Sequence, residues 1–421
     1  MTRLLRATRY TFRAMSVRNY RLYFVGQLIS TSGTWMQSIA QAWLVFQLTG
    51  SGVALGVTTA LQFTPMLLAG AWGGVVADRV EKRRLLIGTQ AASGLLALVL
   101  GAVTAFGVVE LWMIYGLALA LGAVNAIDNP ARRAFVAEMV GTEHLTNAVS
   151  LSSAMFTSAR VIGPAIAGLV IASFGVSWCF FANGLSYVAA VAAFALMRRD
   201  EFFAVSPVPK RKGQLREGLR YAWSTPALRL PLVLTAVIGT LAWNFQVVLP
   251  LLARQTFGGD AGTFGTMYAL MSVGSVVGAL VTAHQARSTQ RFLLGAALAF
   301  GAVLVLAAIA PTLAIEMLAL VLVGGAGIAF TAMANGVLQT ETAPEMRGRV
   351  MALFSVAFLG STPIGGPIVG WVSEQLGPRA GLWLGAVATL AVTTVAIAGV
   401  RRHRARSSTH QEIGEVAVEA A

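Results

Sequence analysis

The sequence is poor in the residues that form disulfides, metal sites and charged surfaces. Its 421 residues include one cysteine, Cys179, so an intrachain disulfide is excluded. The four histidines have no metal-ligand spacing, and we expect neither a metal nor a cofactor; they are His144, His284, His403 and His410. Charged residues make up 11% of the chain and hydrophobic residues 56%. This balance is typical of a protein embedded in a membrane.

Acidic residues are also scarce, 17 against 31 Lys and Arg, which gives a net charge of +14. Nucleic-acid binding would need a basic patch on a polar surface, whereas here the basic residues are spread over short gaps, so we expect no nucleic-acid partner. Of the 31 basic residues, 28 lie in seven polar gaps that alternate with gaps carrying almost none. By the positive-inside rule, this pattern predicts twelve crossings with both termini in the cytoplasm.

We therefore predict an all-α integral membrane protein with twelve transmembrane helices in two pseudo-symmetric six-helix bundles. The predicted N-terminal bundle covers residues 22–197, the cytoplasmic central loop 198–228, and the C-terminal bundle 229–400. Apolar runs place the spans near 22–48, 53–77, 84–107, 110–129, 145–173, 177–197, 229–254, 262–284, 291–310, 313–340, 348–374 and 379–400.

The two halves also resemble each other at fixed offsets, which indicates an internal repeat. Adding 208 to the residue number carries Trp35 to Trp243. Adding 202 carries Ile162-Gly163 to Ile364-Gly365, and Gly168 to Gly370.

The two ends of the chain differ from the bundles. In the basic segment 1–21, Arg3, Arg6, Arg9 and Arg13 recur every three or four residues, which favours an interfacial helix on anionic lipid. The alternative is an unstructured basic tail that only sets the topology. We expect the polar tail 401–421 to be disordered in the cytoplasm.

A polar motif follows the second span, reading Gly74-Val-Val-Ala-Asp-Arg-Val-Glu-Lys-Arg-Arg84. It resembles the loop signature of the major facilitator superfamily, G-x-L-A-D-R-x-G-R-R. The match holds at Gly74, Ala77, Asp78, Arg79 and the basic run that includes Arg83, and it departs at Val76 and Glu81. The resemblance implies a gate in which Asp78 faces the helix beginning near Arg349. Alternatively, Asp78 and Arg79 only solvate a turn.

Three further segments are similar to the drug-efflux branch of this superfamily, which includes macrolide exporters and the enterobactin (siderophore) exporter. They are Asn125-Ala-Ile-Asp-Asn-Pro-Ala-Arg-Arg133, Leu145-Thr-Asn-Ala148 and Arg160-Val-Ile-Gly-Pro164, with Pro344-Glu-Met-Arg-Gly-Arg-Val350 as a second-half counterpart. The resemblance covers roughly residues 17–400. It implies a transporter of the bacterial cytoplasmic (inner) membrane.

Small residues and prolines recur in the fifth and eleventh spans. Gly163, Pro164 and Gly168 resemble the antiporter motif of the fifth helix, and Pro363 and Gly365 repeat the pattern in the second half. Proline bends a helix and glycine permits close packing, so we predict a hinge or seal. The alternative is a kinked, tightly packed helix without a role in transport.

Ionisable residues inside spans are candidates for function because they are costly to insert. Asp128 lies near the cytoplasmic end of the fourth span and Arg160 lies well inside the fifth. We predict that they form a buried, proton-sensitive pair. The alternatives are a static ion pair, or an Arg160 bound to helix-end carbonyls. Drug exporters often carry an arginine in the fourth helix, whereas here that span has none before Arg132.

Polar stripes on apolar helices predict the cavity walls. The predicted lining residues are Gln27, Thr34, Trp35, Ser38 and Gln41 in the first span, Asn125 in the fourth, Trp243 and Gln246 in the seventh, and Thr331 and Asn335 in the tenth. The family resemblance implies that these four helices line the path. Each single residue could instead hydrogen-bond two helices together. Such mixed walls suit amphipathic molecules.

The favoured hypothesis is a proton-coupled exporter of an amphipathic small molecule, a drug or a siderophore-like metabolite, that works as a monomer by alternating access. No phosphate-binding G-x-x-x-x-G-K-[ST] loop occurs, so ATP is excluded as the direct energy source. An importer or facilitator on the same fold is the alternative. A membrane enzyme or sensor is disfavoured, because no nucleophile has an evident base, and we predict no catalytic residues.

Overall fold

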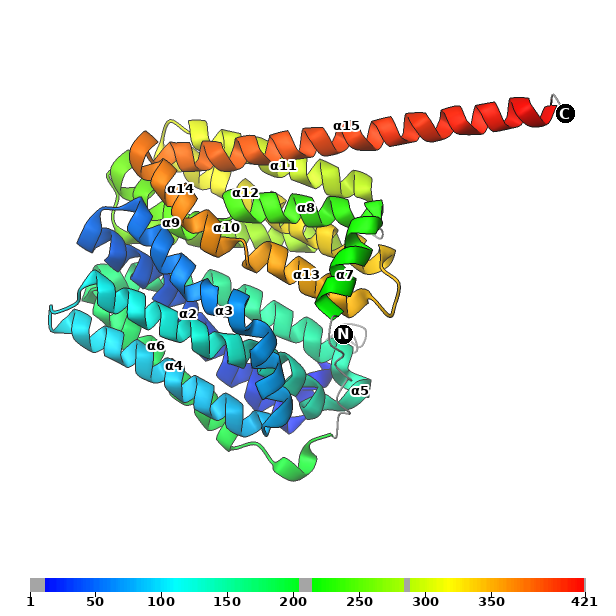
Figure 1. Ribbon diagram of the computed structural model, residues 1–421. Helices are drawn as coiled ribbons and strands as arrows, with labels where there is room; N and C mark the ends of the chain where they lie inside the picture. Colours follow the sequence, from blue (N-terminus) through cyan, green and yellow to red (C-terminus); the bar gives the residue numbers. More distant parts are fainter. Residues whose placement is uncertain (1–11, 204–213, 284–287, 420–421) are drawn as a thin grey trace, which may run out of the picture.

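The structure, a computed structural model, describes residues 12–203, 214–283 and 288–419. Almost all of these residues are helical, and no strand occurs among them. The helices run in similar directions and form two bodies, one from each half of the sequence, that lie against each other (Figure 1). The all-α class and the two-bundle arrangement predicted above are confirmed.

The N-terminal half contains five α-helices and a short 3-10 helix. They are η1 (Arg13–Ser16), α2 (Arg18–Thr49), α3 (Gly52–Arg79), α4 (Lys82–Ala105), α5 (Leu111–Phe174) and α6 (Val176–Ala195). The 64 residues of α5 would extend about 96 Å, far more than a bilayer core of about 30 Å. The helix is interrupted at Gly141, whose φ of 65° is accessible to glycine, so α5 is two antiparallel spans.

The C-terminal half begins after the short helix η2 (Arg199–Glu201). Its helices are α7 (Gln214–Ser224), α8 (Pro226–Leu241), α9 (Phe245–Leu251), the π-helix η3 (Leu252–Thr256), α10 (Ala261–Ala283), α11 (Gln290–Ile309), α12 (Leu313–Glu341), α13 (Arg347–Leu359), α14 (Thr362–Leu376) and α15 (Pro378–Glu419). Two spans are broken near their middle, one between α8 and α9 and the other between α13 and α14.

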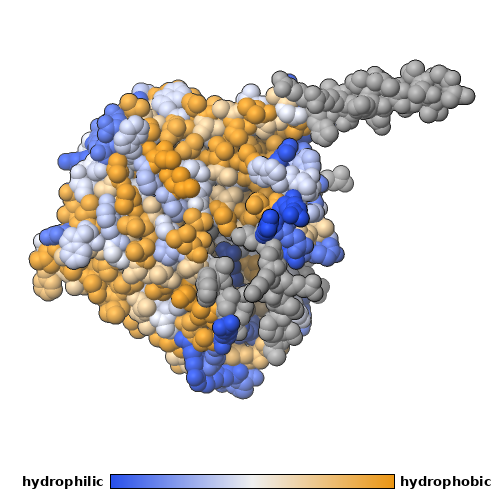
Figure 2. All heavy atoms as spheres, viewed as in Figure 1, coloured by the Kyte–Doolittle hydropathy of each residue, from blue (hydrophilic) through white to orange (hydrophobic). Residues whose placement is uncertain are grey.

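Ten stretches in the described part of the chain are long and apolar enough to cross a membrane. The 64-residue α5 counts once among them although it contains two spans, and α2 is not among them because it is too polar. Dividing α5 and adding α2 gives the twelve predicted crossings. Figure 2 shows apolar side chains over the body and hydrophilic ones near the helix ends, as expected for a surface in contact with lipid.

The tail 401–421 was expected to be disordered, and the structure differs there. Helix α15 continues without a break to Glu419, and its end projects from the body of the molecule (Figure 1). The reason is local: the segment is rich in Arg, Glu and Ala, which favour helix without tertiary support. At the other end, Arg3, Arg6 and Arg9 lie outside the described residues, while Arg13 lies in η1.

The two ends of the bundles have different character. We call the end that carries the long polar connections the basic face. Here Asn19 accepts from the Arg198 backbone N–H at 3.0 Å, and the Ala14 N–H donates to Asn147 at 2.9 Å. The opposite end, the short-turn face, has brief connections between helices, such as Gly50-Ser51 and Gly377.

The contacts between the halves, within the described residues, lie mainly on the side of the short-turn face. Helix α3 packs on α14 so closely that a methyl group on Gly52 would lie 2.5 Å from the carbonyl oxygen of Gly370. The Ser51 hydroxyl donates to Glu374 at 2.5 Å, and the Val53 N–H donates to the same oxygen at 3.0 Å. Toward the basic face, Figure 2 shows a recess between the halves.

Candidate transport pathway

Two tryptophans and an arginine meet where the halves face each other at the centre. The guanidinium of Arg160, from the second span of α5, lies 5.0 Å from the ring centre of Trp35 and 5.9 Å from that of Trp243. Trp35 belongs to α2, and Trp243 lies in the break between α8 and α9. These tryptophans are the pair related by the 208-residue offset. One ring from each half therefore contacts the same cation.

Aromatic side chains extend this cluster into both halves. Trp35 contacts Phe156 at 6.0 Å and Tyr268 of α10 at 6.3 Å between ring centres. Trp243 stacks on Phe300 at 5.7 Å and meets Phe358 edge-on at 5.5 Å. The walls are therefore apolar and aromatic, with one cation between them.

The predicted pair of Asp128 and Arg160 is wrong. Among the described residues, the partners of the Asp128 carboxylate are Arg132, Thr89 and Gln90. Within the same part of the chain, Arg160 forms no ion pair with a carboxylate. The two residues lie in different clusters because Asp128 points toward α4 within its own bundle, while Arg160 lies against the tryptophans.

Asp128 is the centre of a buried polar network in the N-terminal half. Its side chain is 1% exposed and forms an ion pair with Arg132, one helical turn later. The Thr89 hydroxyl and the Gln90 amide donate to the same carboxylate oxygen at 2.6 and 2.9 Å. Arg132 in turn donates to Gln27 of α2 at 2.7 Å. The network links α2, α4 and α5, and it holds one negative and one positive charge.

The sequence analysis did not predict that Arg132 lies in a helix. The fourth span was expected to end near residue 129, before Pro130, which would place Arg132 in a loop. Instead the helix continues through Pro130 to the break at Gly141. The spacing of four residues between Asp128 and Arg132 was the signal available, because such residues are neighbours on a helix.

The polar residues of the first span have two different roles. Gln27 and Gln41 are buried, and Thr34 shares a hydrogen bond of 3.1 Å with the Tyr187 hydroxyl of α6. Ser38 donates back to the Thr34 carbonyl at 3.0 Å. Gln27 and Thr34 therefore join helices within the N-terminal half, whereas Trp35 faces the other half.

The other predicted cavity residues lie along the facing helices and are partly exposed. Asn125 and Gln246 are half-buried in α5 and α9. On α12, Thr331 donates to the Gly327 carbonyl at 2.8 Å, and Asn335 accepts from Gln339. The stripe on α12 is thus satisfied mostly within its own helix.

The gate motif is described only in part. Gly74 and Asp78 lie near the end of α3, where only the backbone is described. Arg79 is exposed, and Arg83 donates to the carbonyls of Phe194 and Ala195 at 2.6 and 2.7 Å. Arg83 therefore caps the end of α6.

The helix that the family resemblance places opposite Asp78 is α13. Arg349, at the start of α13, pairs with Glu217 of α7 at 2.8 Å.

The repeated small residues pack in the same way in both halves. A methyl group on Gly163 would lie 2.5 Å from Trp35 Cβ, and one on Gly365 would collide with the Thr240 carbonyl of α8. Each glycine thus fits against the first helix of its own bundle. Gly168 and Gly370 instead face the opposite half, against Gly265 and Gly52. Pro164 is buried within α5, whereas Pro363 begins α14 and follows the helix break.

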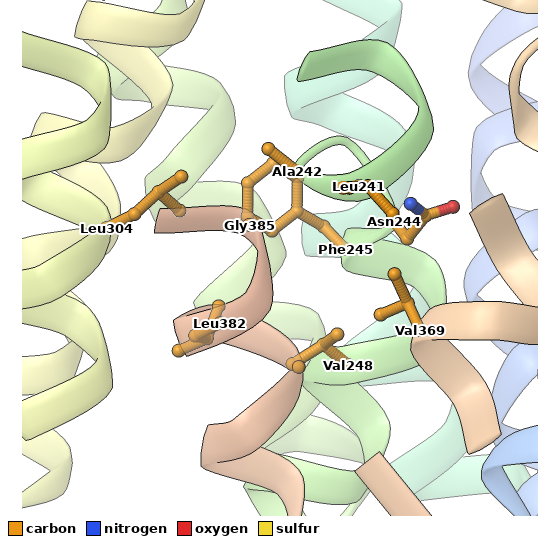
Figure 3. A pocket seen from close by; sticks show the side chains of 10 residues that line it. Leu241, Ala242, Asn244, Phe245, Val248, Leu304, Val369, Leu382 and Gly385 are labelled. Carbon is orange, nitrogen blue, oxygen red and sulfur yellow. The ribbon is translucent and has the colours of Figure 1, made fainter. Parts of the chain in front are cut away.

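The structure also contains two hollows that lie away from the central cluster of Trp35, Arg160 and Trp243. One lies inside the C-terminal half beside the break between α8 and α9, lined by residues such as Ala242, Phe245 and Leu382 (Figure 3). It offers about 10 Å³, room for one water at most. The other, of about 500 Å³, is an open apolar groove between α4 and α5 that includes Val80, Ile127 and Thr89. Thr89 connects this groove to Asp128.

A buried acid near the short-turn face was also missed. Glu316 is 0% exposed, and neither carboxylate oxygen has a hydrogen-bond partner among the described residues. Arg379 is close enough to interact with Glu316 through its charge, but its guanidinium donates to the Ala310 carbonyl at 2.5 Å. From the sequence, Glu316 resembles an ordinary acid in the first turn of a helix, and its burial depends on tertiary packing.

Comparisons with known proteins agree with this architecture. The family model described as transmembrane secretion effector matches residues 10–418. The enterobactin exporter EntS of Shigella boydii is 27% identical over 373 residues, 86% of each chain. The multidrug efflux pump Tap of Mycolicibacterium fortuitum is 26% identical over 374 residues, 85% of this chain and 90% of that one.

A third relative matches over a shorter region. The staphyloferrin A transporter of Staphylococcus aureus is 27% identical over 265 residues, and the chain spans 66% of its length. Among solved structures, a bacterial homologue of the human lysosomal transporter Spinster, inward-facing and unoccupied, has a TM-score of 0.71 at 15% identity. This match covers 91% of this chain and 96% of that one, and it supports the fold alone.

These relatives are transporters, which agrees with the prediction that the chain is not an enzyme. The family match covers nearly the whole chain and both bundles. The chain belongs to the transmembrane secretion effector family, within the major facilitator superfamily of multi-pass membrane transporters.

Proposed function

We propose that the chain is a proton-coupled exporter that moves amphipathic small molecules by alternating access. The observation that carries the proposal is the one-sided contact between the halves. They are joined at the short-turn face by the glycine contacts and Glu374, and the recess between them lies toward the basic face. Rocking about the centre would close one end and open the other.

The proposed orientation places the basic face and both termini in the cytoplasm of a bacterium, in the cytoplasmic membrane. The distribution of Lys and Arg supports it. The arrangement described above is then open to the inside, ready to receive a molecule from the cytoplasm. Both halves of the pathway come from one chain, so we propose that the monomer is the working unit.

The proposed substrate is an amphipathic molecule of the drug or siderophore type. The names of three relatives support this class: an enterobactin exporter, a multidrug efflux pump and a staphyloferrin A transporter. The aromatic walls around Trp35 and Trp243 suit such a molecule better than a sugar. Ser38, Gln41, Asn125, Gln246, Thr331 and Asn335 are the proposed polar contacts on the same helices.

The proposed proton site is Asp128, held by Arg132 instead of Arg160. Protonation of the carboxylate would remove its attraction for Arg132 and weaken the links to α2 and α4. The apolar groove beside Thr89 lies next to this site. Gly74, Asp78 and Arg79 remain the proposed gate, and Gly163, Pro164, Gly168, Pro363 and Gly365 the proposed packing hinge.

Transport in inverted membrane vesicles tests the proposal. An exporter should accumulate an amphipathic dye inside such vesicles when respiration acidifies their interior, and a protonophore should abolish the accumulation. Vesicles without the protein are the control. An importer or facilitator, the second candidate, would show no uphill accumulation in this orientation, and that result would overturn the exporter.

A further inference from the structure

The starting point is the electrostatic balance of the central region. Asp128 and Arg132 form a pair and cancel each other. Arg160 has no carboxylate partner among the described residues, and its side chain is partly exposed between the halves. A guanidinium inside a membrane span costs several kcal/mol unless it is compensated. Within the described part of the chain, Arg160 is therefore a positive charge at the centre without a carboxylate to balance it.

The two tryptophans hold this charge without neutralising it. Their rings contact the guanidinium at 5.0 and 5.9 Å, in the range of cation–π attraction. Such contacts engage the charge through ring faces and provide no hydrogen-bond acceptor. The N–H groups of Arg160 have no acceptor among the residues described, and the indole N–H of Trp243 is likewise without one. The N–H groups of Arg160 are therefore free to donate hydrogen bonds to a bound molecule, and the two tryptophan rings already hold the guanidinium in position.

We propose that Arg160 is the anchor of a binding site for amphipathic anions, which rests on the transport role proposed above. The planar guanidinium matches a carboxylate, or another planar group with two oxygens, through two parallel hydrogen bonds. Trp35, Phe156 and Tyr268 supply the apolar wall for the body of the molecule. The site thus selects an organic acid with an aromatic or aliphatic body over its neutral analogue.

The position of Arg160 also connects binding to movement of the halves. Arg160 and Trp35 belong to the N-terminal half, while Trp243 belongs to the C-terminal half. Rocking of the halves leaves the contact with Trp35 intact and changes the contact with Trp243. A bound anion replaces part of the attraction between Arg160 and Trp243, and so favours separation of the halves at the centre.

Binding of a matched pair of probes tests the site directly. The probes are 2-naphthoate and 2-naphthamide, which have the same ring and differ in charge. Calorimetric titration uses the purified full-length protein in lipid nanodiscs at pH 7.5. We expect the acid to bind the wild type at least tenfold more tightly than the amide, which corresponds to about 1.4 kcal/mol. Arg160→Gln should erase the difference while leaving the affinity for the amide within about twofold.

Arg254→Gln is the matched control, because Arg254 is a lone arginine exposed near the short-turn face. It should leave the preference unchanged. Equal affinity of the two probes for the wild type, or absence of naphthoate binding, would overturn the proposal even if Arg160→Gln fails to fold. The proposal would also be overturned if a folded Arg160→Gln protein still bound naphthoate more tightly than naphthamide.

The vesicle assay separates this site from the transport proposal. Binding of naphthoate that depends on Arg160, in a protein that pumps no dye, supports the site and rejects the exporter. Pumping of a neutral dye, without any preference for the acid in the binding experiment, supports the exporter and rejects the site.

Discussion

The two halves of the molecule have the same helix arrangement but differ in the side chains that they bury. The N-terminal half buries a charged network in which Asp128, Arg132 and Gln27 connect three helices. The C-terminal half instead has an aromatic cluster, where Trp243 packs against Phe300 and Phe358. In the mechanism proposed above, the N-terminal half responds to a proton through this network, while the C-terminal half contributes an aromatic wall.

The substitution with the largest expected effect tests whether the charged network couples transport to protons. Asp128→Asn removes the charge that holds Arg132 but keeps the size of the side chain. We expect uphill dye accumulation in energised inverted vesicles to fall below about a tenth of the wild-type rate, because protonation no longer changes the network. The rate should be normalised to the amount of protein in the membrane.

The buried acid of the C-terminal half provides the matched control for this variant. Glu316→Gln removes a carboxylate that has no hydrogen-bond partner in the described structure, so we expect transport within about twofold of wild type. If Glu316→Gln abolished accumulation and Asp128→Asn did not, the assignment of the two halves would be reversed.

The next prediction concerns the contribution of the charged network to the stability of the protein. Arg132→Gln leaves the buried Asp128 charge without its partner, and we expect a loss of about 3 kcal/mol in the free energy of unfolding. This is the lower end of the usual range, because Arg132 is 23% exposed. Thermal unfolding in detergent measures the change. The neighbouring exposed Arg133→Gln should have little effect, and the double variant Asp128→Asn with Arg132→Gln should recover part of the loss.

The charged network also marks the limit of what the sequence could predict. Hydropathy and the distribution of basic residues predicted twelve spans, because lipid demands long apolar helices. They could not predict whether Pro130 ends a helix or lies within it, since neighbouring groups can satisfy the carbonyl that proline frees. Arg132 was placed in a loop for that reason, and Asp128 was assigned the wrong partner.

The aromatic centre illustrates the same limit in another way. The 208-residue offset identified Trp35 and Trp243 as equivalent positions, but equivalence does not require that the two rings approach one cation. That contact depends on how the two bundles lie against each other. The glycine pattern was more informative, because close packing needs a small residue wherever two helices cross.

The paired glycines offer a test in which the two halves should behave alike. Gly163→Ala would bring a methyl group against Trp35, and Gly365→Ala would bring one against the Thr240 carbonyl. Since helix backbones must move apart in both cases, we expect each variant to lose about 2 kcal/mol of stability. Gly116→Ala is the control, because a methyl group there meets nothing within 4 Å. A loss confined to one half would show that the repeat does not extend to packing.

The smallest expected effect lies where the halves meet. Glu374 of the C-terminal half accepts two hydrogen bonds from the N-terminal half, through the Ser51 hydroxyl and the Val53 N–H. Glu374→Gln keeps an acceptor but removes the charge, so these bonds should weaken without being lost. We expect the population closed at the short-turn face to fall about threefold relative to the open one, because exposed bonds of this kind contribute about 1 kcal/mol or less.

Spin labels on Gln47→Cys and Gln375→Cys, two exposed positions beside this contact, measure the closed and open populations by their separation. The buried native Cys179 is replaced by serine in all samples. Glu110→Gln is the control, since the Glu110 carboxylate accepts a hydrogen bond from the Trp112 indole within the N-terminal half. An unchanged distance distribution in Glu374→Gln would mean that the glycine contacts alone hold the two halves together at this face, and that the polar bonds between them are incidental to closure.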